Sequence, residues 1–492
     1  MKYISTRGAH TDGVSSAYAI KTGLASDGGL FMPEEIPEIT LEEITAMISQ
    51  PYPVRCAGVL SKFLTDYTYS ELISDAEDAY ASFYDFPAKL TDLGELGSML
   101  ELWHGPTAAF KDMALQIMPR LFVRALAKCG EERTAMILVA TSGDTGKAAL
   151  EGYRDIQGTK IKVFYPIDGV SSVQKLQMQT QAGNNVSVCG IVGNFDDAQN
   201  GVKRIFASGE MRRELDADGV FLSSANSINW GRLVPQIVYY ISAYCDMVKS
   251  DKIRIGDEID VCVPTGNFGN IFACYLAKKM GLPVGKLICA SNSNNVLTDF
   301  LSTGVYDRNR AFHTTMSPSM DILISSNLER LLYVTLGAEK TARYMRELAE
   351  CGRYSLSAED FDKIKADFVG YYATENETSE AVRYIYENKN CLIDTHTAVA
   401  IHATVKYRSE YKAERIILTV STASAYKFAA DVYRALTGNV PHSDLAALDM
   451  LKKLTSVEIP EPLSSLASRS VIHDAVIEKD EMDNSVRAFS KK

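Results

Sequence analysis

A lysine close to the predicted start of a helix is the first residue of this sequence that could carry chemistry. Lys111 lies in the segment HGPTAAFKDM, residues 104–113, after a Gly-Pro turn and several apolar residues. The unpaired N–H groups in the first turn of a helix carry roughly half a positive charge, which disfavours a cation there. Lys111 is therefore either an ordinary surface residue or a lysine whose position lowers its pKa for a reaction.

A glycine loop with the sequence TGNFGN follows the apolar run IDVCVP. Gly266 and Gly269 let the backbone turn, and they let N–H groups approach a ligand closely. Because a helical pattern begins near Asn270, the loop is suited to hold a phosphate at a helix N-terminus. The G-x-G-x-x-G spacing of dinucleotide-binding loops is absent. A plain strand-to-helix turn would give the same pattern, so the sequence leaves both interpretations open.

The segment VATSGDTGKAAL, residues 139–150, is a second loop between a strand and a helix. Thr141, Ser142 and Thr145 supply hydroxyl donors, and the nearby N–H groups are suited to a carboxylate or a phosphate. Asp144 or Thr145 would equally serve as an ordinary helix N-cap. Two loops of this kind indicate a substrate and a cofactor that both carry negative groups.

An arginine and a group of hydroxyls complete the candidate residues. In ANSINWGRLVPQ, Arg232 follows a glycine and would grip a phosphate through two N–H groups, or lie on the surface at a helix start. In ILTVSTASAYKF, Ser421, Thr422 and Ser424 follow an apolar strand. Hydroxyls at the carboxyl end of a parallel strand face a ligand crevice or cap the next helix, and composition does not separate the two.

The elements that position these residues alternate strand, loop and helix, as around residues 134–153. This alternation predicts an α/β protein whose parallel sheets are buried by helices. Residues 1–95 are predicted to form a mostly helical region, with an amphipathic helix that opens at Thr40. Residues 320–390 are rich in charge and tyrosine, and we expect them to be helical without strands. Residues 477–492 are expected to form a polar, solvated end.

Composition and charge exclude several classes of protein. The net charge of the 492 residues is −11 and no basic block is present, which argues against nucleic-acid binding. The nine cysteines are scattered without a C-x-x-C pair, so we expect no zinc site, no disulfides and a reducing, cytoplasmic setting. We also expect no metal site, no secretory signal and no membrane span. The G-x-S-x-G motif of serine hydrolases is absent.

Five motifs taken together resemble the threonine synthase family. In chain order they are HGPTAAFKD, ATSGDTG, NSINWGR, TGNFGN and TMSPSMDILISSNLER, and the opening segments MKYISTRG and DGGLFMPEEIP are similar to the start of that family. The resemblance extends from residue 1 to about residue 430. It implies a pyridoxal 5′-phosphate enzyme of fold type II, the tryptophan-synthase-β-like fold, with two parallel-sheet α/β domains, a helical N-terminal region and a helical insertion.

The resemblance also assigns roles to individual residues. Lys111 matches the family's Schiff-base lysine, and Thr422 matches a threonine that faces the pyridine nitrogen of the cofactor. The loop expected to bind the cofactor phosphate comprises Gly266, Asn267, Phe268, Gly269 and Asn270. The residues expected to bind the substrate are Thr141, Ser142, Gly143, Asp144, Thr145, Asn229 and Arg232.

The implied reaction converts O-phospho-L-homoserine and water to L-threonine and phosphate, the last step of threonine biosynthesis. A threonine-synthase-like phospho-lyase that releases 2-oxobutyrate would use the same loops, so it stays an alternative. A catalytically silent relative is a further alternative, although it would have no need of Lys111. We expect a small-molecule substrate and a monomer or homodimer.

The resemblance predicts how the chain divides into domains. We expect residues 1–95 to form the N-terminal region and residues 446–492 a C-terminal extension. We expect residues 96–135 and 256–445 to form a larger cofactor-binding domain with an insertion at 320–390, and residues 136–255 to form a smaller mobile domain.

The sequence differs from the family pattern at one site. The family often has His-Pro where this chain has Ser424 and Ala425. Any role of that histidine is therefore absent here.

Overall fold

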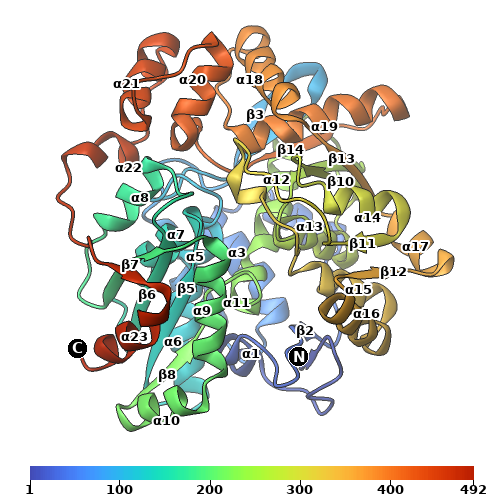
Figure 1. Cartoon of the computed structure of the whole chain (residues 1–492). Coiled ribbons are helices and arrows are strands. Elements are labelled where there is room, and N and C mark those ends of the chain that lie inside the picture. Colours follow the sequence, from blue (N-terminus) through green and yellow to red (C-terminus); the bar gives the residue numbers. More distant parts are fainter.

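The computed structural model describes residues 1–492 and builds the chain around two sheets (Figure 1). The larger sheet has six strands in the order β13-β10-β9-β14-β4-β3. Its neighbouring strands are parallel, except that β3 and β4 pair antiparallel. The strands are β3 (Lys89–Asp92), β4 (Ser98–Glu101), β9 (Ile259–Pro264), β10 (Val284–Ser291), β13 (Phe368–Tyr372) and β14 (Ile417–Ser421).

The smaller sheet has five strands in the order β15-β7-β6-β5-β8, all of them parallel. They are β5 (Thr134–Ala140), β6 (Thr159–Pro166), β7 (Val186–Val192), β8 (Val220–Ser223) and β15 (Val476–Glu478). The strand β5, which lies between β6 and β8, is buried along nearly its whole length, as expected for a parallel sheet covered on both faces. The prediction of an α/β fold with two largely parallel sheets is therefore confirmed.

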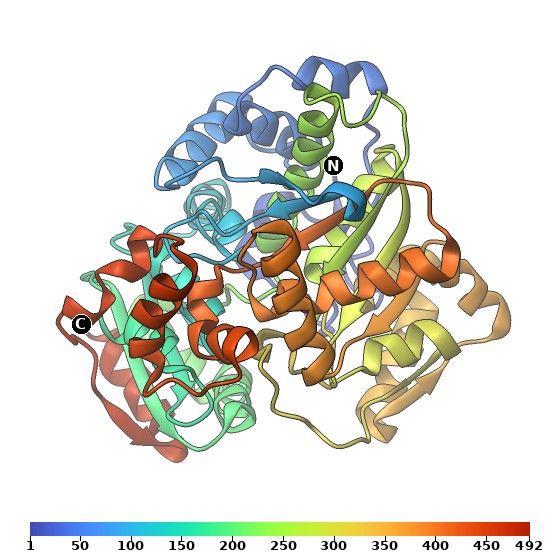
Figure 2. The same cartoon turned by 90° about the horizontal axis from the view of Figure 1, so that it is seen from above.

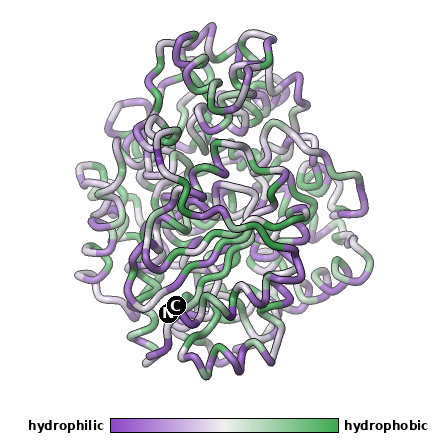
Figure 3. The backbone as a smooth tube through the Cα atoms, turned by 60° about the vertical axis from the view of Figure 1, so that its left-hand side comes forward, coloured by the Kyte–Doolittle hydropathy of each residue, from purple (hydrophilic) through white to green (hydrophobic).

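Helices cover both sheets and join them into one body. α7 (Asp144–Tyr153) and α9 (Phe195–Ala207) pack on the smaller sheet, and α19 (Thr395–Tyr411) packs on the larger one. α12 (Pro235–Lys249) packs against α13 (Gly269–Met280). The largest apolar cluster contains side chains from both sheets, and Figure 3 shows the hydrophobic segments gathered in the interior.

The N-terminal region is mostly helical, as predicted. It contains α1 (Ser16–Thr22), α2 (Leu41–Met47), α3 (Tyr52–Phe63) and α4 (Tyr69–Tyr80), together with the paired strands β1 (Tyr3–Ser5) and β2 (Phe31–Pro33). Thr40 is the N-cap of α2, and its hydroxyl and the Glu43 carboxylate form a capping box. α3 packs against α12, so this region supports the larger sheet through the helices that cover it.

The expectation that residues 320–390 lack strands is wrong. The segment contains α15 (Leu328–Leu336), α16 (Ala338–Cys351), α17 (Ala358–Lys365) and α18 (Glu375–Lys389), but also β12 (Arg353–Ser355) and β13. β13 extends the larger sheet by pairing parallel with β10. Its sequence FVGYY is only five residues long and stands between charged helical patterns. A short edge strand of this kind gains its stability from the neighbouring strand rather than from its own periodicity.

The expectation of a solvated end at residues 477–492 is also wrong. β15 pairs with β7, and α23 (Met482–Ser490) follows it. Met482, Val486 and Phe489 belong to the apolar cluster on the smaller sheet. Their spacing of i, i+4 and i+7 places them on one helical face, a signal that the many charges around them concealed. Figure 2 shows the C-terminal segment, in red, beside the green strands of the smaller sheet.

The remaining elements connect these layers. No helix combines the length and the apolar character that crossing a bilayer would require. The other α-helices and strands are α5 (Asp112–Leu115), α6 (Met118–Lys128), α8 (Ser172–Gln179), α10 (Gly209–Ala217), α11 (Trp230–Leu233), α14 (Val296–Thr303), β11 (Val305–Asp307), α20 (Ala429–Thr437), α21 (Asp444–Thr455) and α22 (Glu461–Ser464). The short 3₁₀ helices are η1 (Gly94–Leu96), η2 (Pro318–Met320), η3 (Ala425–Phe428), η4 (Leu466–Ser468) and η5 (Lys479–Glu481).

Candidate active site

A cavity of about 780 Å³ lies where the carboxyl ends of strands from both sheets face each other. This edge is the usual ligand crevice of an open parallel sheet. The loops that follow β5, β8, β9 and β14 all contribute to its wall. The predicted residues that line it are Lys111, Thr141, Ser142, Asp144, Thr145, Arg232, Gly266, Asn267, Phe268, Gly269, Asn270 and Thr422.

Backbone pairing brings Lys111 to the end of β14. Ala109 and Ala423 form an isolated antiparallel bridge, and the Phe110 N–H donates to the Thr422 carbonyl at 2.8 Å. The chain then turns into α5, whose N-cap residue is Lys111. Lys111 and Thr422 therefore share one cavity although they lie 311 positions apart in the sequence.

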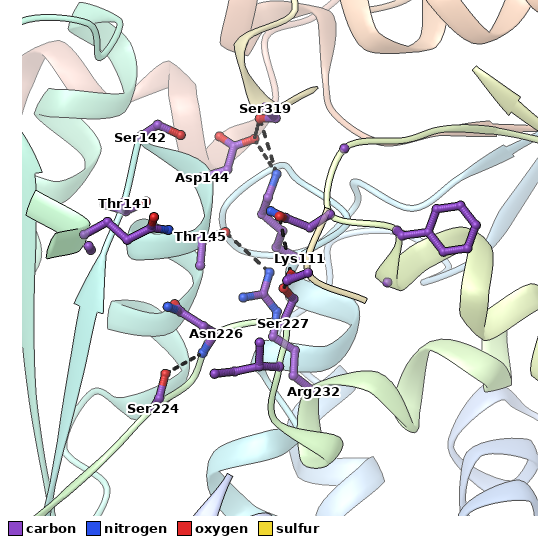
Figure 4. Close-up of a pocket in the computed structure, with 18 of the residues that line it drawn as sticks. Lys111, Thr141, Ser142, Asp144, Thr145, Ser224, Asn226, Ser227, Arg232 and Ser319 are labelled. Atoms are coloured by element: carbon purple, nitrogen blue, oxygen red, sulfur yellow. Dashed lines mark hydrogen bonds and ion pairs between the residues drawn. The ribbon is translucent and has the colours of Figure 1, made fainter. Parts of the chain in front are cut away.

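The amine of Lys111 points into the cavity rather than into solvent (Figure 4). Its Nζ lies 3.2 Å from Asp144 Oδ2 and 3.4 Å from Ser319 Oγ, and only 10% of the side chain is exposed. Burial lowers the pKa of Lys111, whereas Asp144 acts to raise it. Lys111 is therefore not an ordinary surface lysine, and its surroundings favour a neutral amine more than solvent would.

The glycine loop leaves one buried hydrogen-bond donor without a partner. Phe268 adopts a left-handed backbone with φ of 63°, and α13 begins at the next residue. Asn270 Oδ1 accepts from the hydroxyls of Tyr239 and Tyr240 at 2.5 and 2.6 Å. This contact fixes the amide, and Asn270 Nδ2 is left buried without a partner. An unsatisfied donor beside the first N–H groups of a helix suits a phosphate.

The loop after β5 uses most of its side chains within the protein. Thr141 Oγ1 accepts from the N–H groups of Gly143 and Gly146 at 3.0 and 2.9 Å. Gly143 does not line the cavity, and a side chain there would collide with Gln174. Ser142 and Thr145 line the cavity, and their side chains remain partly exposed.

Asp144 lines the cavity, and its carboxylate is engaged by cationic and amide groups of the protein. Its carboxylate contacts Lys111, and Lys427 Nζ lies 2.8 Å from Oδ1. Gln174 Nε2 donates to the same oxygen at 2.7 Å. Burial would raise the pKa of the Asp144 carboxyl, but Lys427 and Lys111 outweigh burial and hold the pKa well below its ordinary value. A carboxylate engaged in this way repels an anion, so Asp144 can bind an anionic substrate only through its backbone.

Arg232 is a buried guanidinium without an acidic partner. Nη1 donates to the Ala225 carbonyl at 3.1 Å, and Nη2 donates to Thr145 Oγ1 at 3.4 Å. No carboxylate lies within ion-pair distance, and burial lowers the pKa of Arg232 to about 10. A buried charge of this kind needs a partner of opposite sign. The cavity beside Arg232 therefore suits an anionic group.

Asn229 lies behind the cavity rather than in it, in contrast to the predicted role in substrate binding. It is fully buried, and its Nδ2 donates to the carbonyls of Ile20 and Ser224 at 2.9 and 3.1 Å. Oδ1 accepts from the Gly231 N–H at 2.8 Å, which makes Asn229 the N-cap of α11. The side chain is therefore used to place the loop that carries Arg232.

Sequence reasoning missed several residues around the cavity. Ser319 lies in the motif TMSPSMDILISSNLER, for which the sequence alone predicts no chemical role. Its backbone N–H donates to His396 Nε2 at 3.1 Å, and His396 Nδ1 lies 2.9 Å from Asp394 Oδ2. Asp394 and His396 are two positions apart, a local signal that could have marked them as an oriented pair. The other missed polar residues on the cavity wall include Ser224, Asn226, Ser227 and Ser326.

Comparison with known proteins shows similarity along the whole chain. A family model described as "Threonine synthase N terminus" matches residues 2–80, and one described as "Pyridoxal-phosphate dependent enzyme" matches residues 98–422. Threonine synthase from Pseudomonas aeruginosa is 37% identical over 459 residues, which cover 92% of this chain and 94% of that protein. Threonine synthase-like 1 from Homo sapiens is 41% identical over 436 residues, 85% of this chain. The match spans only 57% of that relative's length.

Solved structures show the same similarity. The crystal structure of pyridoxal-phosphate-bound threonine synthase from Brucella melitensis has a TM-score of 0.88 and 34% identity, and the match covers all of both chains. The crystal structure of threonine synthase from yeast has a TM-score of 0.88 and 31% identity, and covers 99% of this chain and 98% of that one. The fold described above is therefore the fold of these proteins.

Proposed function

Since the chain belongs to the threonine synthase family of pyridoxal-phosphate-dependent enzymes, we propose that it converts O-phospho-L-homoserine and water to L-threonine and phosphate. The observation that carries the proposal is the arrangement of charge in the cavity. A desolvated lysine amine shares the cavity with two features suited to anions, the glycine loop and the unpaired Arg232. One feature suits the phosphate of the cofactor and the other suits the phosphate of the substrate.

The residues at the cavity fit pyridoxal 5′-phosphate. The unsatisfied Asn270 amide and the first N–H groups of α13 would hold its phosphate. Thr422, whose backbone pairs with the Lys111 loop, would face the ring nitrogen with a neutral hydroxyl. Lys111 would bind the cofactor covalently through its amine. When bound, the cofactor supplies an electron sink for chemistry at the substrate's Cα and Cβ.

Lys111 acts as the proton carrier of the reaction. An amine must be neutral to bind a carbonyl carbon covalently, and burial of Lys111 favours that state. In its free form the amine of Lys111 would take the proton from the substrate's Cα and move protons at Cβ. Asp144 and Ser319 hold the amine in reach of these atoms through their hydrogen bonds to Nζ.

Arg232 stabilises the phosphate that leaves from Cγ. Its guanidinium is already turned towards the Thr145 hydroxyl and has no carboxylate of its own (Figure 4). A phosphate placed there would receive a charge-assisted pair of hydrogen bonds, and Ser142 and Thr145 would add hydroxyl donors. After phosphate has left from Cγ, water adds at Cβ. Closure of the smaller sheet over the cavity would exclude other water.

Product analysis tests the proposal. The purified protein is incubated with pyridoxal 5′-phosphate and O-phospho-L-homoserine, and we expect threonine and phosphate in equal amounts. The Lys111→Ala variant should form neither, whereas the surface variant Lys453→Ala should match the unaltered protein, because Lys453 is exposed on α21. Phosphate with 2-oxobutyrate in place of threonine would make the protein a phospho-lyase. Absence of phosphate release would contradict the proposed substrate.

A further inference from the structure

A second lysine, Lys427, is buried directly behind the cavity. Its side chain has no exposed surface and does not line the cavity. Nζ lies 2.8 Å from Asp144 Oδ1, 2.9 Å from Gln177 Oε1 and 3.0 Å from the Thr107 carbonyl oxygen. Removing an ammonium from water is energetically unfavourable unless partners compensate for the lost hydration. Three acceptors within hydrogen-bonding distance compensate the ammonium of Lys427, so the structure around it is suited to a charged lysine.

Lys427 joins three segments that meet at Lys111. It lies on η3, which follows the end of β14 of the larger sheet. Asp144 and Gln177 belong to α7 and α8, beside the smaller sheet. Thr107 belongs to the loop that carries Lys111. The ammonium of Lys427 therefore fixes the carboxylate of Asp144 relative to the loop of Lys111.

The carboxylate of Asp144 contacts two lysines that differ in whether the proposed reaction requires them to lose a proton. Oδ2 faces Lys111 and Oδ1 faces Lys427. In the proposed reaction the amine of Lys111 must become neutral before it can bind the cofactor, whereas nothing requires Lys427 to lose its proton. Lys427 is therefore the permanent counter-ion of Asp144, and Lys111 is the temporary one.

We propose that Lys427 is a positioning residue that balances the charge of Asp144, so that Asp144 orients the amine of Lys111 without holding its proton. The inference rests on the role proposed for Lys111 in the reaction. If Lys427 were absent, Asp144 and Lys111 would form an isolated buried ion pair. Each partner of such a pair stabilises the charge of the other, and Lys111 would then keep its proton.

The other charged groups around Lys111 support this balance. Burial lowers the pKa of Lys111, Asp144 raises it, and Arg232 from α11 and Lys427 from η3 both lower it further. Lys203 on α9 and His396 on α19 also line the cavity, and the ring of Phe110 lies 4.8 Å from Nζ. Asp144 is the single carboxylate on the cavity wall. The site therefore holds more positive than negative charge, which favours release of the Lys111 proton.

Competitive labelling of Lys111 tests the proposal without substrate. Full-length protein freed of its cofactor is treated with traces of acetic anhydride over a range of pH, and acetylation of the Lys111 peptide is measured by mass spectrometry. Only the neutral amine reacts. In the Lys427→Met variant we expect labelling of Lys111 to be about tenfold slower at a pH below its pKa, because a neighbouring cation has been removed.

The chain offers a matched control. Lys147 is another buried lysine on α7, paired with Glu151 at 3.0 Å and outside the cavity. The Lys147→Met variant should leave the labelling of Lys111 unchanged, which separates a loss of charge beside Asp144 from a general effect of removing a buried lysine. Equal labelling of Lys111 in Lys427→Met and in the unaltered protein would overturn the proposal.

A second variant keeps the test decisive if Lys427→Met does not fold. Lys427→Gln replaces the ammonium with a neutral amide that still donates hydrogen bonds, and the same slower labelling is expected. Unchanged or faster labelling would overturn the proposal. Neither measurement uses O-phospho-L-homoserine. Failure of the unaltered protein to form threonine would therefore contradict the proposed function, whereas failure of the labelling shift would contradict only the role of Lys427.

Discussion

The two loops that face each other across the cavity have similar sequences but different internal contacts. TSGDTG follows β5 and TGNFGN follows β9, and both lead into a helix at the carboxyl end of a parallel strand. In the second loop the Asn270 amide remains a free donor. In the first, Thr141 and Asp144 are occupied by contacts within the protein. One loop is therefore preorganised for an anion, and the other mainly positions Lys111.

Replacement of Lys111 should distinguish the functions of the two loops most clearly. We expect Lys111→Ala to lower turnover of O-phospho-L-homoserine by about 10³-fold or more, because the nucleophile and the proton carrier are both lost. The glycine loop should still bind pyridoxal 5′-phosphate, now without a covalent bond. Visible absorbance should change, while equilibrium dialysis still detects the cofactor. A variant that no longer binds the cofactor at all would contradict the idea that the glycine loop is an independent anion site.

Removal of Asp144 should have the next largest effect, on stability. Asp144→Ala leaves the buried Lys427 and the largely buried Lys111 without a carboxylate. The free energy of unfolding of the cofactor-free protein should fall by about 3 kcal/mol, as expected when one partner of a buried ion pair is removed. Urea unfolding at neutral pH measures the difference.

A surface ion pair provides the control for Asp144. Asp483 contacts Arg204 at 2.9 Å, and the arginine side chain is 48% exposed. Asp483→Ala should change the free energy of unfolding very little, because solvent screens such pairs. Equal losses of unfolding free energy in Asp144→Ala and Asp483→Ala would show that the buried contacts of Asp144 stabilise the protein no more than a surface ion pair does.

Replacement of Asn270 tests whether the glycine loop binds an anion. Asn270→Ala removes the free amide donor of the glycine loop, so the dissociation constant of pyridoxal 5′-phosphate should rise about tenfold, the usual cost of one hydrogen bond to a charged group. A fluorescence titration gives the constant. Tyr240→Phe is the control, since it removes only one of the two hydroxyls that fix the Asn270 side chain. Equal weakening by both variants would mean that the amide acts through its tyrosine partners rather than on the cofactor.

The sequence could predict those parts of the fold and site that depend on local patterns. The strand-loop-helix order, the cap at Thr40 and the place of Lys111 at a helix start all depend on residues close in sequence. Lys427 and Asn229 could not be interpreted in this way, because their partners come from distant segments: Asp144 lies 283 positions from Lys427, and Ile20 lies 209 positions from Asn229. Only the folded chain shows that the donors of Lys427 and Asn229 are engaged within the protein, whereas Asn270 Nδ2 has no partner.

The two threonines at the starts of the loops give the smallest expected difference. Thr141 Oγ1 accepts two N–H groups of its own loop, whereas Thr265 Oγ1 donates to the Val263 carbonyl at 2.7 Å. Thr141→Val would leave two buried N–H donors unpaired and should cost about 2 kcal/mol of unfolding free energy, against about 1 kcal/mol for Thr265→Val. Thr141→Ser keeps the hydroxyl and should be close to the unaltered protein. Urea unfolding of the three variants measures these differences. Equal losses of unfolding free energy in Thr141→Val and Thr265→Val would show that the first loop depends on its threonine no more than the second loop does. The difference between the two loops would then depend on Asp144 alone.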